Sequence, residues 1–164
     1  MNIGIAFSLE SINIVGEVAT GDSERIERIV SSDVKNFITV SKGRIYVGDD
    51  ALLRAEVDPE AKCHSLAQIH SLNGIVLDRK RYSVEEIVHL LMARALEKLA
   101  ERVTALGVDY GQPTVVIACL PPDNIYFWRQ LLVRWLGTFG AGSCRVVEQT
   151  VAASLHPKLL DVEG

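Results

Sequence analysis

The sequence has little cysteine, and its cysteines are poorly placed for cross-linking. The 164 residues include three, Cys63, Cys119 and Cys144, which is an odd number at wide spacing. Such a pattern argues against a disulfide framework and against a zinc site built on cysteine pairs. We therefore expect reduced and mostly structural cysteines.

Long hydrophobic runs and an excess of basic residues are also missing. The apolar runs are shorter than a membrane span, and the N-terminus has neither a basic flank nor a small-residue cleavage site. A net charge of −4 with interspersed signs gives no electrostatic footprint for nucleic acid. We expect a cytoplasmic protein that binds neither membrane nor nucleic acid. The short basic cluster from Arg79 to Arg81 is interpreted as a solvated loop.

Hydrophobic residues, in contrast, make up 48% of the chain, enough for the core of one ordinary domain. A long helix is predicted from Ser83, whose spacing from Glu86 is that of a capping box, to a stop at Gly107. The run from Val115 to Leu120 has no period, which is typical of a strand covered on both faces. The apolar stripe of the long helix is Ile87, Leu91, Ala95, Leu99, Val103 and Leu106.

Two hairpins are predicted before this helix. The first joins residues 2–7 to 12–18, and the second joins 36–40 to 44–47 through a three-residue loop with Gly43 at positive φ. Residues 25–30 are ambiguous. A short helix with Asp49 or Asp50 as its N-cap ends near Val57, residues 61–71 form another, and Asn73-Gly74 is a turn.

After the buried strand, the pattern predicts a helix at 125–138, a short strand at 144–147 and a last helical turn or two at 148–155. The apolar face of the 125–138 helix contains Trp128, Leu131, Leu132, Trp135 and Leu136. The two tryptophans are interpreted as core anchors.

Five stretches match one family in the right order. They are Ile3-Gly4-Ile5, Val47-Gly48-Asp49-Asp50-Ala51, Pro59-Glu60, the run from Tyr82 to Ile87, and the run from Glu148 to Ala153. The sequence resembles the N-terminal half of the ATPase domain of the seventy-kilodalton heat-shock chaperones, within the actin, hexokinase and chaperone superfamily.

This resemblance implies an α/β fold with a ribonuclease H-like mixed five-stranded sheet and flanking helices, the first half of an actin-like ATPase domain. Residues 1–164 would form a single subdomain, with residues 41–82 as a shortened arm inserted before the long helix. In complete members of the family, ATP lies in a cleft between this half and a second, homologous half.

At the positions that the resemblance assigns to the family's first phosphate loop, this chain departs from the family's pattern. In the family, the carboxylate of the loop organises magnesium through water and its glycine lets the backbone approach the phosphates. Neither is present, and a glutamate stands where phosphate oxygens would come. Ser8 and Ser11 still offer hydroxyl groups, either to a ligand or to a plain hairpin turn. The matching positions are Ala6, Phe7, Ser8, Leu9 and Glu10.

Other family positions are lost or ambiguous. The catalytic lysine corresponds to Ala67, beside Gln68, and no positive charge remains for phosphoryl transfer. Pro121 matches the proline after the fourth strand, and Glu148 matches the glutamate at the cleft base, where a structural role is also open. The candidate cofactor-binding positions are thus Ser8, Ser11 and Glu148. We expect no catalytic residue and no cofactor, and ATP with magnesium only if a second half is present.

Isolated reactive residues do not add up to a further site. Cys63, His64 and His70 would need another ligand to hold a metal, so no metal site is expected. Ser65 with His70 lacks the context of an activated nucleophile, and His89 is interpreted as a partly buried helix residue.

Three functional hypotheses follow. The first is a divergent chaperone-like ATPase-domain half without catalysis, acting as a structural or protein-interaction module. The second is the nucleotide-binding half of a larger ATP-dependent chaperone, and the third is an actin-like assembly or partition component. The expected partner is another protein or the second half itself.

Overall fold

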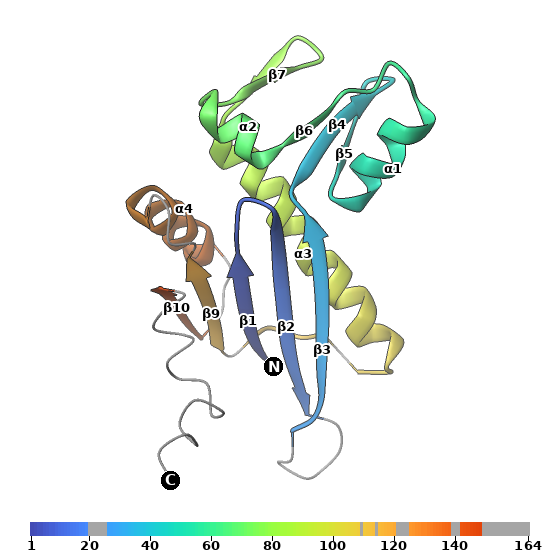
Figure 1. Cartoon of the computed structure of the whole chain (residues 1–164). Helices are drawn as coiled ribbons and strands as arrows, with labels where there is room; N and C mark the ends of the chain where they lie inside the picture. Colours follow the sequence, from blue (N-terminus) through green and yellow to red (C-terminus); the bar gives the residue numbers. More distant parts are fainter. Residues whose placement is uncertain (20–25, 109, 114, 121–124, 139–141, 149–164) are drawn as a thin grey trace, which may run out of the picture.

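The protein is built around a five-stranded mixed sheet in the order β10-β9-β1-β2-β3 (Figure 1). The structure is a computed structural model that describes residues 1–19, 26–108, 110–113, 115–120, 125–138 and 142–148. β1, β2 and β3 are antiparallel neighbours, whereas β1, β9 and β10 run parallel. The predicted N-terminal hairpin, the interior parallel strand and the α/β class are confirmed. The strands are β1 (Asn2–Phe7), β2 (Ser11–Ala19), β3 (Ile26–Lys35), β9 (Val115–Leu120) and β10 (Ser143–Glu148).

Strand β3 is longer than the sequence indicated. Residues 25–30 were ambiguous, yet β3 begins at Ile26 and continues through ten residues. Ser32 and Val34 both face the core and are buried. The Ser32 hydroxyl donates to the carbonyl of Ala95 at 3.2 Å, which satisfies it away from water. A serine at a core position had hidden the period of two.

The long helix α3 (Val84–Ala105) forms as the sequence predicts. The N–H of Glu86 donates to the Ser83 hydroxyl at 3.1 Å, and the N–H of Ser83 donates to Glu86 Oε2 at 2.8 Å, which completes the capping box. Gly107 follows the helix end with a φ of 76°. Leu106 departs from the prediction: it lies past the end of the helix and is 39% exposed. The rest of the stripe is fully buried, namely Ile87, Leu91, Ala95, Leu99 and Val103.

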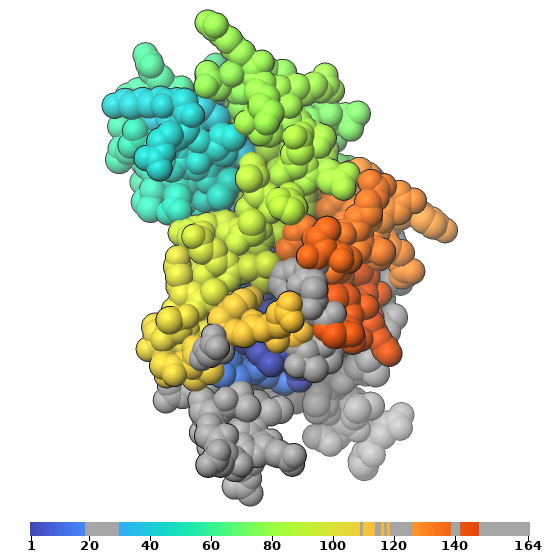
Figure 2. All heavy atoms as spheres, turned by 180° about the vertical axis from the view of Figure 1, so that it is seen from behind, coloured from blue at the N-terminus to red at the C-terminus, as the bar shows by residue number. Residues whose placement is uncertain are grey.

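Helices α3 and α4 (Ile125–Gly137) pack on one face of the sheet, α3 over β2 and β3, and α4 over β9 and β10. Figure 2 shows this side of the molecule, with α4 in orange beside α3 in yellow-green. Ile5 and Phe7 point to this face and are buried, whereas Gly4 and Ala6 point away and are exposed. Among the described elements, no helix covers the opposite face. In the described part of the chain, helices therefore cover only one face of the sheet.

Helix α4 matches its predicted range to within one residue at its end. Its apolar face is buried as predicted, including Trp128 and Trp135, so the interpretation of the tryptophans as core anchors is confirmed. None of the described helices has the length and apolar character needed to cross a membrane.

The arm, taken from here on as residues 37–82, lies beyond one end of the five-stranded sheet (Figure 1). It contains a three-stranded antiparallel sheet in the order β5-β4-β6, two short helices and a two-stranded hairpin. The predicted hairpin in this region and the helix ending at Val57 are confirmed. The elements are β4 (Phe37–Ser41), β5 (Arg44–Val47), α1 (Asp49–Val57), β6 (Cys63–Ser65), α2 (Leu66–Ser71), β7 (Ile75–Leu77) and β8 (Lys80–Tyr82).

Two details at the start of the arm differ from the prediction. The β4–β5 turn has two residues rather than three, with φ of 49° at Lys42 and 72° at Gly43, as a type I′ hairpin requires. Helix α1 has Gly48 as its N-cap, without a side-chain hydrogen bond. Asp49 and Asp50 lie instead in the first turn, where the positive end of the helix dipole stabilises their negative charges.

The second part of the arm also contains more strand than expected. Residues 61–71 do not form one helix: strand β6 precedes helix α2. The basic cluster at 79–81 is exposed, but only Arg79 lies in a turn, while Lys80 and Arg81 belong to β8. Strands of three residues are too short to show a period of two, so their pairing was not visible in the sequence.

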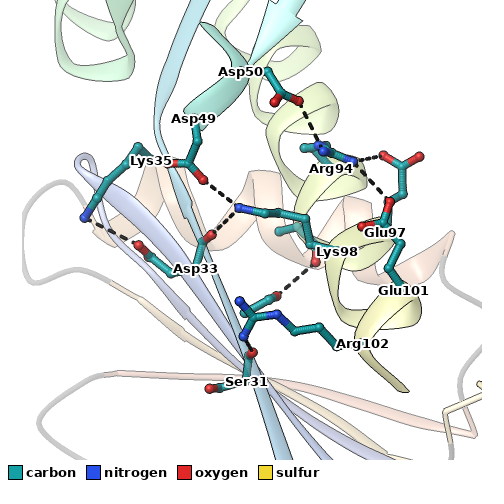
Figure 3. A network of polar contacts seen from close by, with 12 residues as sticks. Ser31, Asp33, Lys35, Asp49, Asp50, Arg94, Glu97, Lys98, Glu101 and Arg102 are labelled. Atoms are coloured by element: carbon teal, nitrogen blue, oxygen red, sulfur yellow. Dashed lines mark hydrogen bonds and ion pairs between the residues drawn. The ribbon is translucent and has the colours of Figure 1, made fainter. Parts of the chain in front are cut away.

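A basic ladder of Arg94, Lys98 and Arg102 runs along α3 beside β3, the terminal strand of the sheet (Figure 3). Arg102 Nη1 donates to the carbonyl of Ser31, and Lys98 Nζ donates to that of Asp33 at 3.0 Å. Unpaired groups along a terminal strand are a template for pairing with another chain. The ladder therefore closes part of the free edge of β3.

The same ladder holds the arm to the sheet. Lys98 Nζ lies 2.6 Å from Asp49 Oδ2, and Arg94 Nη2 lies 3.1 Å from Asp50 Oδ2 (Figure 3). Both acids belong to the first turn of α1, so one face of α3 bridges the sheet and the arm.

Candidate functional site at the carboxyl ends of the parallel strands

The carboxyl ends of β1, β9 and β10 meet at one edge of the sheet. Ala6 is in register with Cys119, and Glu148 with Leu120. Ligands of open α/β sheets bind outside this kind of edge, where the chain changes direction across the sheet. The turn that follows β1 and the last residue of β10 therefore share the candidate site.

The structure brings the predicted site residues to this edge. Ser8 and Ser11 begin and end the β1–β2 turn, and Glu148 ends β10 two strands away. The predicted helical turns at 148–155 do not begin at Glu148, which belongs to β10. Pro121, the side chain of Glu148 and residues 149–155 lie outside the described set. What can be analysed is the turn and the elements packed around it.

The Ser8 hydroxyl is fully engaged within the turn. Its Oγ accepts the backbone N–H of Glu10 at 3.2 Å and that of Ser11 at 3.0 Å. It donates in return to the carbonyl of Ser11 at 3.0 Å, which also accepts the N–H of Ser8. The Ser11 hydroxyl accepts from Asn13 Nδ2 at 3.3 Å. This geometry is that of a self-satisfied serine turn.

Asn36 is a functional-site neighbour that the sequence analysis missed. It is completely buried, and its Nδ2 donates to the carbonyl of Ser8 at 2.7 Å. Its backbone N–H donates to the carbonyl of Glu10, and its own carbonyl accepts the N–H of Leu66, both at 2.8 Å. Asn36 thus fixes the turn to the start of α2. Its Oδ1 has no partner within the described residues.

Helix α2 occupies the place assigned to the family's catalytic lysine. Ala67 is exposed on its first turn. Gln68 closes a capping box with Ser65: its N–H donates to Ser65 Oγ at 3.3 Å, and the Ser65 N–H donates to Gln68 Oε1 at 3.2 Å. The Ser65 hydroxyl therefore acts as a helix cap.

An aromatic cluster fills the space behind the turn. The ring of Trp128 lies 5.1 Å from that of Phe7 and 4.9 Å from that of His70. Phe127 completes the cluster, at 4.7 Å from Trp128 and 5.2 Å from His70. These contacts join β1, α2 and α4, and aromatic pairs at such distances add to the stability of a core. The cluster places the imidazole ring of His70 against the rings of Phe127 and Trp128.

The remaining reactive residues do not converge. Cys63 and His64 lie in β6 and His70 in α2, and within the described residues no three metal-ligating side chains form a group. Burial raises the pKa of the Cys63 thiol, which opposes thiolate chemistry. Burial, and then the charge of Lys62, lowers the pKa of His64. His89 is exposed on α3, so its interpretation as a partly buried residue was wrong.

The edge therefore offers a tight, internally bonded turn with an exposed carboxylate at Glu10. The Ser8 hydroxyl and the N–H groups of Glu10 and Ser11 make their hydrogen bonds within the turn. No protein-family model matches the sequence, and a search of curated proteins found no match either.

Proposed function

We propose that this chain is a divergent half of an actin-like ATPase domain of the heat-shock chaperone type, which has lost ATP hydrolysis and acts in the cytoplasm as a structural or protein-interaction module. The proposal rests on the retained scaffold and on the altered turn after β1.

The sheet topology supports the fold part of the proposal. Three antiparallel strands are followed, after the arm and α3, by the parallel strands β9 and β10 on the other side of β1. A ribonuclease H-like sheet has this order, with its third, second and first strands followed by the fourth and fifth. The shortened arm between β3 and α3 is where chaperone-type members of the superfamily carry their extra subdomain.

The observation that carries the functional part is the bonding of Ser8. A phosphate loop presents free backbone N–H groups to the ligand, but here the N–H groups of Glu10 and Ser11 both point to Ser8 Oγ. The exposed Glu10 carboxylate adds repulsion, about 1 kcal/mol per charge pair at 4 Å in water. The bonded N–H groups and the Glu10 carboxylate both oppose the binding of ATP at this edge of the sheet.

Calorimetric titration of the full chain with magnesium and ATP tests the proposal. We expect no saturable heat up to about 1 mM ATP, a concentration that would reveal affinities down to roughly −4 kcal/mol. The Glu10→Thr variant should still bind no ATP, because Ser8 continues to occupy the two N–H groups. Glu17→Thr, on the neighbouring strand, is its matched control.

Two results would contradict the proposal. One is micromolar ATP binding by the unaltered chain, which would favour the hypothesis of a nucleotide-binding half. The other is ATP turnover gained by the chain on combining Ala6→Asp with Glu10→Thr, because hydrolysis in this superfamily needs the opposite wall of the cleft.

A further inference from the structure

Helix α4 exposes an apolar stripe on the side that faces away from the sheet. Tyr126 is 85% exposed, and Val133, two helical turns later, is 53% exposed. Residues seven positions apart lie on the same side of an α-helix, so the two side chains form one stripe. The opposite side of the helix is buried in the core. We call this stripe, with its neighbours Arg129 and Arg134, the α4 face.

The α4 face is positively charged. By helical periodicity, Arg129 lies on one side of the stripe and Arg134 on the other, and both are exposed. Arg134 Nη1 lies 3.4 Å from Glu85 Oε2, but both side chains are more than half exposed, and a surface contact of this kind contributes little. Helix α4 contains no acidic residue, although the whole chain has a net charge of −4.

Helix α1 exposes a second apolar stripe, beside which the charges are negative. Leu53 is 60% exposed and Val57, one turn later, is 71% exposed. Glu56 lies on one side of this stripe and Asp50 on the other, and both are exposed. The single base of the helix, Arg54, is engaged within the arm. We call the stripe and its two acids the α1 face.

The acids of the α1 face can still accept a partner. The Glu56 side chain makes no hydrogen bond or ion pair within the described part of the chain. Asp50 Oδ2 lies 3.1 Å from Arg94 Nη2, yet its side chain stays about half exposed. The two faces are therefore complementary, because one sets an apolar pair between two arginines and the other sets an apolar pair between two carboxylates.

The two faces lie on opposite flanks of the molecule, the α4 face beside β9 and β10 and the α1 face in the arm (Figure 1). Both stay exposed within one chain. Complementary surfaces at different places on one molecule make a heterologous contact, in which each copy can use one face on one neighbour and the other face on the next.

From these observations we infer that the α4 face of one copy of this chain binds the α1 face of a second copy, head to tail. The inference rests on the proposed function as a protein-interaction module and names the two surfaces and the partner. The apolar stripes pack against each other and leave water, and the arginines meet the carboxylates and fix the orientation. Because neither face is used twice, further copies can add in a row.

The contact is small and therefore weak. Two short helix faces bury less than about 1,200 Å² in total, the range of transient complexes. We expect a dissociation constant on the order of 0.1–1 mM, so that the chain is a monomer at low micromolar concentration.

Sedimentation equilibrium of the full chain tests the inference. The weight-average mass should rise roughly twofold or more between about 10 µM and 1 mM protein. Raising the salt concentration from about 0.05 M to 0.5 M should weaken the association several-fold, because the paired charges lie near the surface.

Two double variants locate the contact. Tyr126→Gln with Val133→Gln removes the apolar stripe of the α4 face, and Leu53→Gln with Val57→Gln removes that of the α1 face. Glutamine suits a helix and leaves the net charge unchanged. Each double variant alone should associate at least roughly tenfold more weakly than the unaltered chain.

Mixing the two double variants gives the sharpest result. The mixture should form a dimer and nothing larger, because only one intact α4 face and one intact α1 face can meet. Val76→Gln is the control, since Val76 is exposed in β7, outside both faces, and it should associate as the unaltered chain does. Far-ultraviolet circular dichroism checks that each variant is folded.

The inference is overturned if the unaltered chain stays monomeric up to about 1 mM. It is also overturned if either double variant alone still associates like the unaltered chain, or if their mixture forms no dimer. These results are independent of the ATP titration. A monomer that binds no ATP removes only this inference, whereas micromolar ATP binding removes the proposed function whatever the state of association.

Discussion

Short networks of hydrogen bonds fix the positions and the pKa values of single side chains in the arm, and Asp58 is the clearest case. Ser41 donates to its Oδ2, Arg54 Nε donates to Ser41 at 2.9 Å, and the Glu60 N–H donates to Oδ1 at 3.1 Å. The Ser41 bond, then the Glu60 N–H and the charges of Arg54 and Lys42, hold the pKa of Asp58 below its ordinary value, despite some desolvation.

Removing the hydrogen bond from Ser41 should raise the pKa of Asp58. In Ser41→Ala, we expect the pKa of Asp58 to rise toward its ordinary value, as followed by carboxyl carbon NMR. A carboxylate with a depressed pKa in the folded state contributes stability that is present above its unfolded pKa and is lost as pH falls through the folded one. The variant should therefore lose less stability on acidification. Ser71→Ala is the control, and an unchanged Asp58 titration would refute the assignment.

The capping box of α3 is the second residue-scale feature with a measurable effect. Ser83→Ala removes the acceptor for the Glu86 N–H, and we expect a loss of about 1 kcal/mol in the free energy of unfolding, within a range of about 0.5–2. Urea denaturation measures it. Ser83→Asp keeps an acceptor and should stay close to the unaltered protein; an equal loss in both variants would point to a cause other than capping.

At the scale of elements, α3 and β3 show what the sequence could and could not reveal. The helix was predictable because its period, its cap at Ser83 and its stop at Gly107 all agree locally. β3 was not, because Ser32 stands in the core and finds its partner, Ala95, in another element. Periodicity identifies a buried face only when that face is apolar.

The same distinction holds at the candidate site. The turn residues Ser8 and Ser11 were identifiable from their position after the first strand. Asn36 was not, because its role consists of contacts with Ser8 and Leu66, which are distant in sequence. The orientation of the Ser8 hydroxyl inside the turn was likewise open until the backbone geometry was known.

The basic ladder gives an element-scale prediction. Replacing both Lys98 and Arg102 by alanine uncovers the carbonyls of Asp33 and Ser31 on the terminal strand β3. We expect concentration-dependent self-association, seen as a rise in mass by light scattering, because an uncovered edge pairs with other chains. Arg94→Ala is the matched control: it removes a cation from the same helix face but contacts no β3 carbonyl. A monomeric double variant would show that the ladder does not protect the edge.

For the whole molecule, the junction between sheet and arm matters more than either part alone. The chain leaves the sheet at Asn36 and returns through α3. Gly48, the N-cap of α1, packs closely against Val34 of β3. A Cβ on Gly48 would lie 2.7 Å from Val34 Cγ1, and its backbone has φ of 69° and ψ of −139°. Only glycine adopts that conformation without strain.

Gly48→Ala should therefore lower the stability of the whole protein. We expect a loss of about 1–3 kcal/mol from backbone strain, measured by thermal or urea unfolding. Gly4→Ala serves as the control, because its Cβ would meet nothing within 4 Å on the exposed sheet face, and a strand interior favours alanine by roughly 0.5–1 kcal/mol. Equal effects in the two variants would contradict a close packing of arm and sheet.

The parallel pairing of β1 with β9 also has a consequence for how the protein is made. Asn2 is in register with Val115, so the partner of the first strand is translated more than 100 residues later. At about 5–20 residues per second, that interval lasts roughly 5 to 20 seconds. During that interval β1, β2 and β3 can pair with one another, but the side of β1 that later pairs with β9 has no partner strand. Because β9 and β10 extend the sheet on the side of β1 opposite to β2, that edge stays open to strands of neighbouring nascent chains until residues 115–120 have been made.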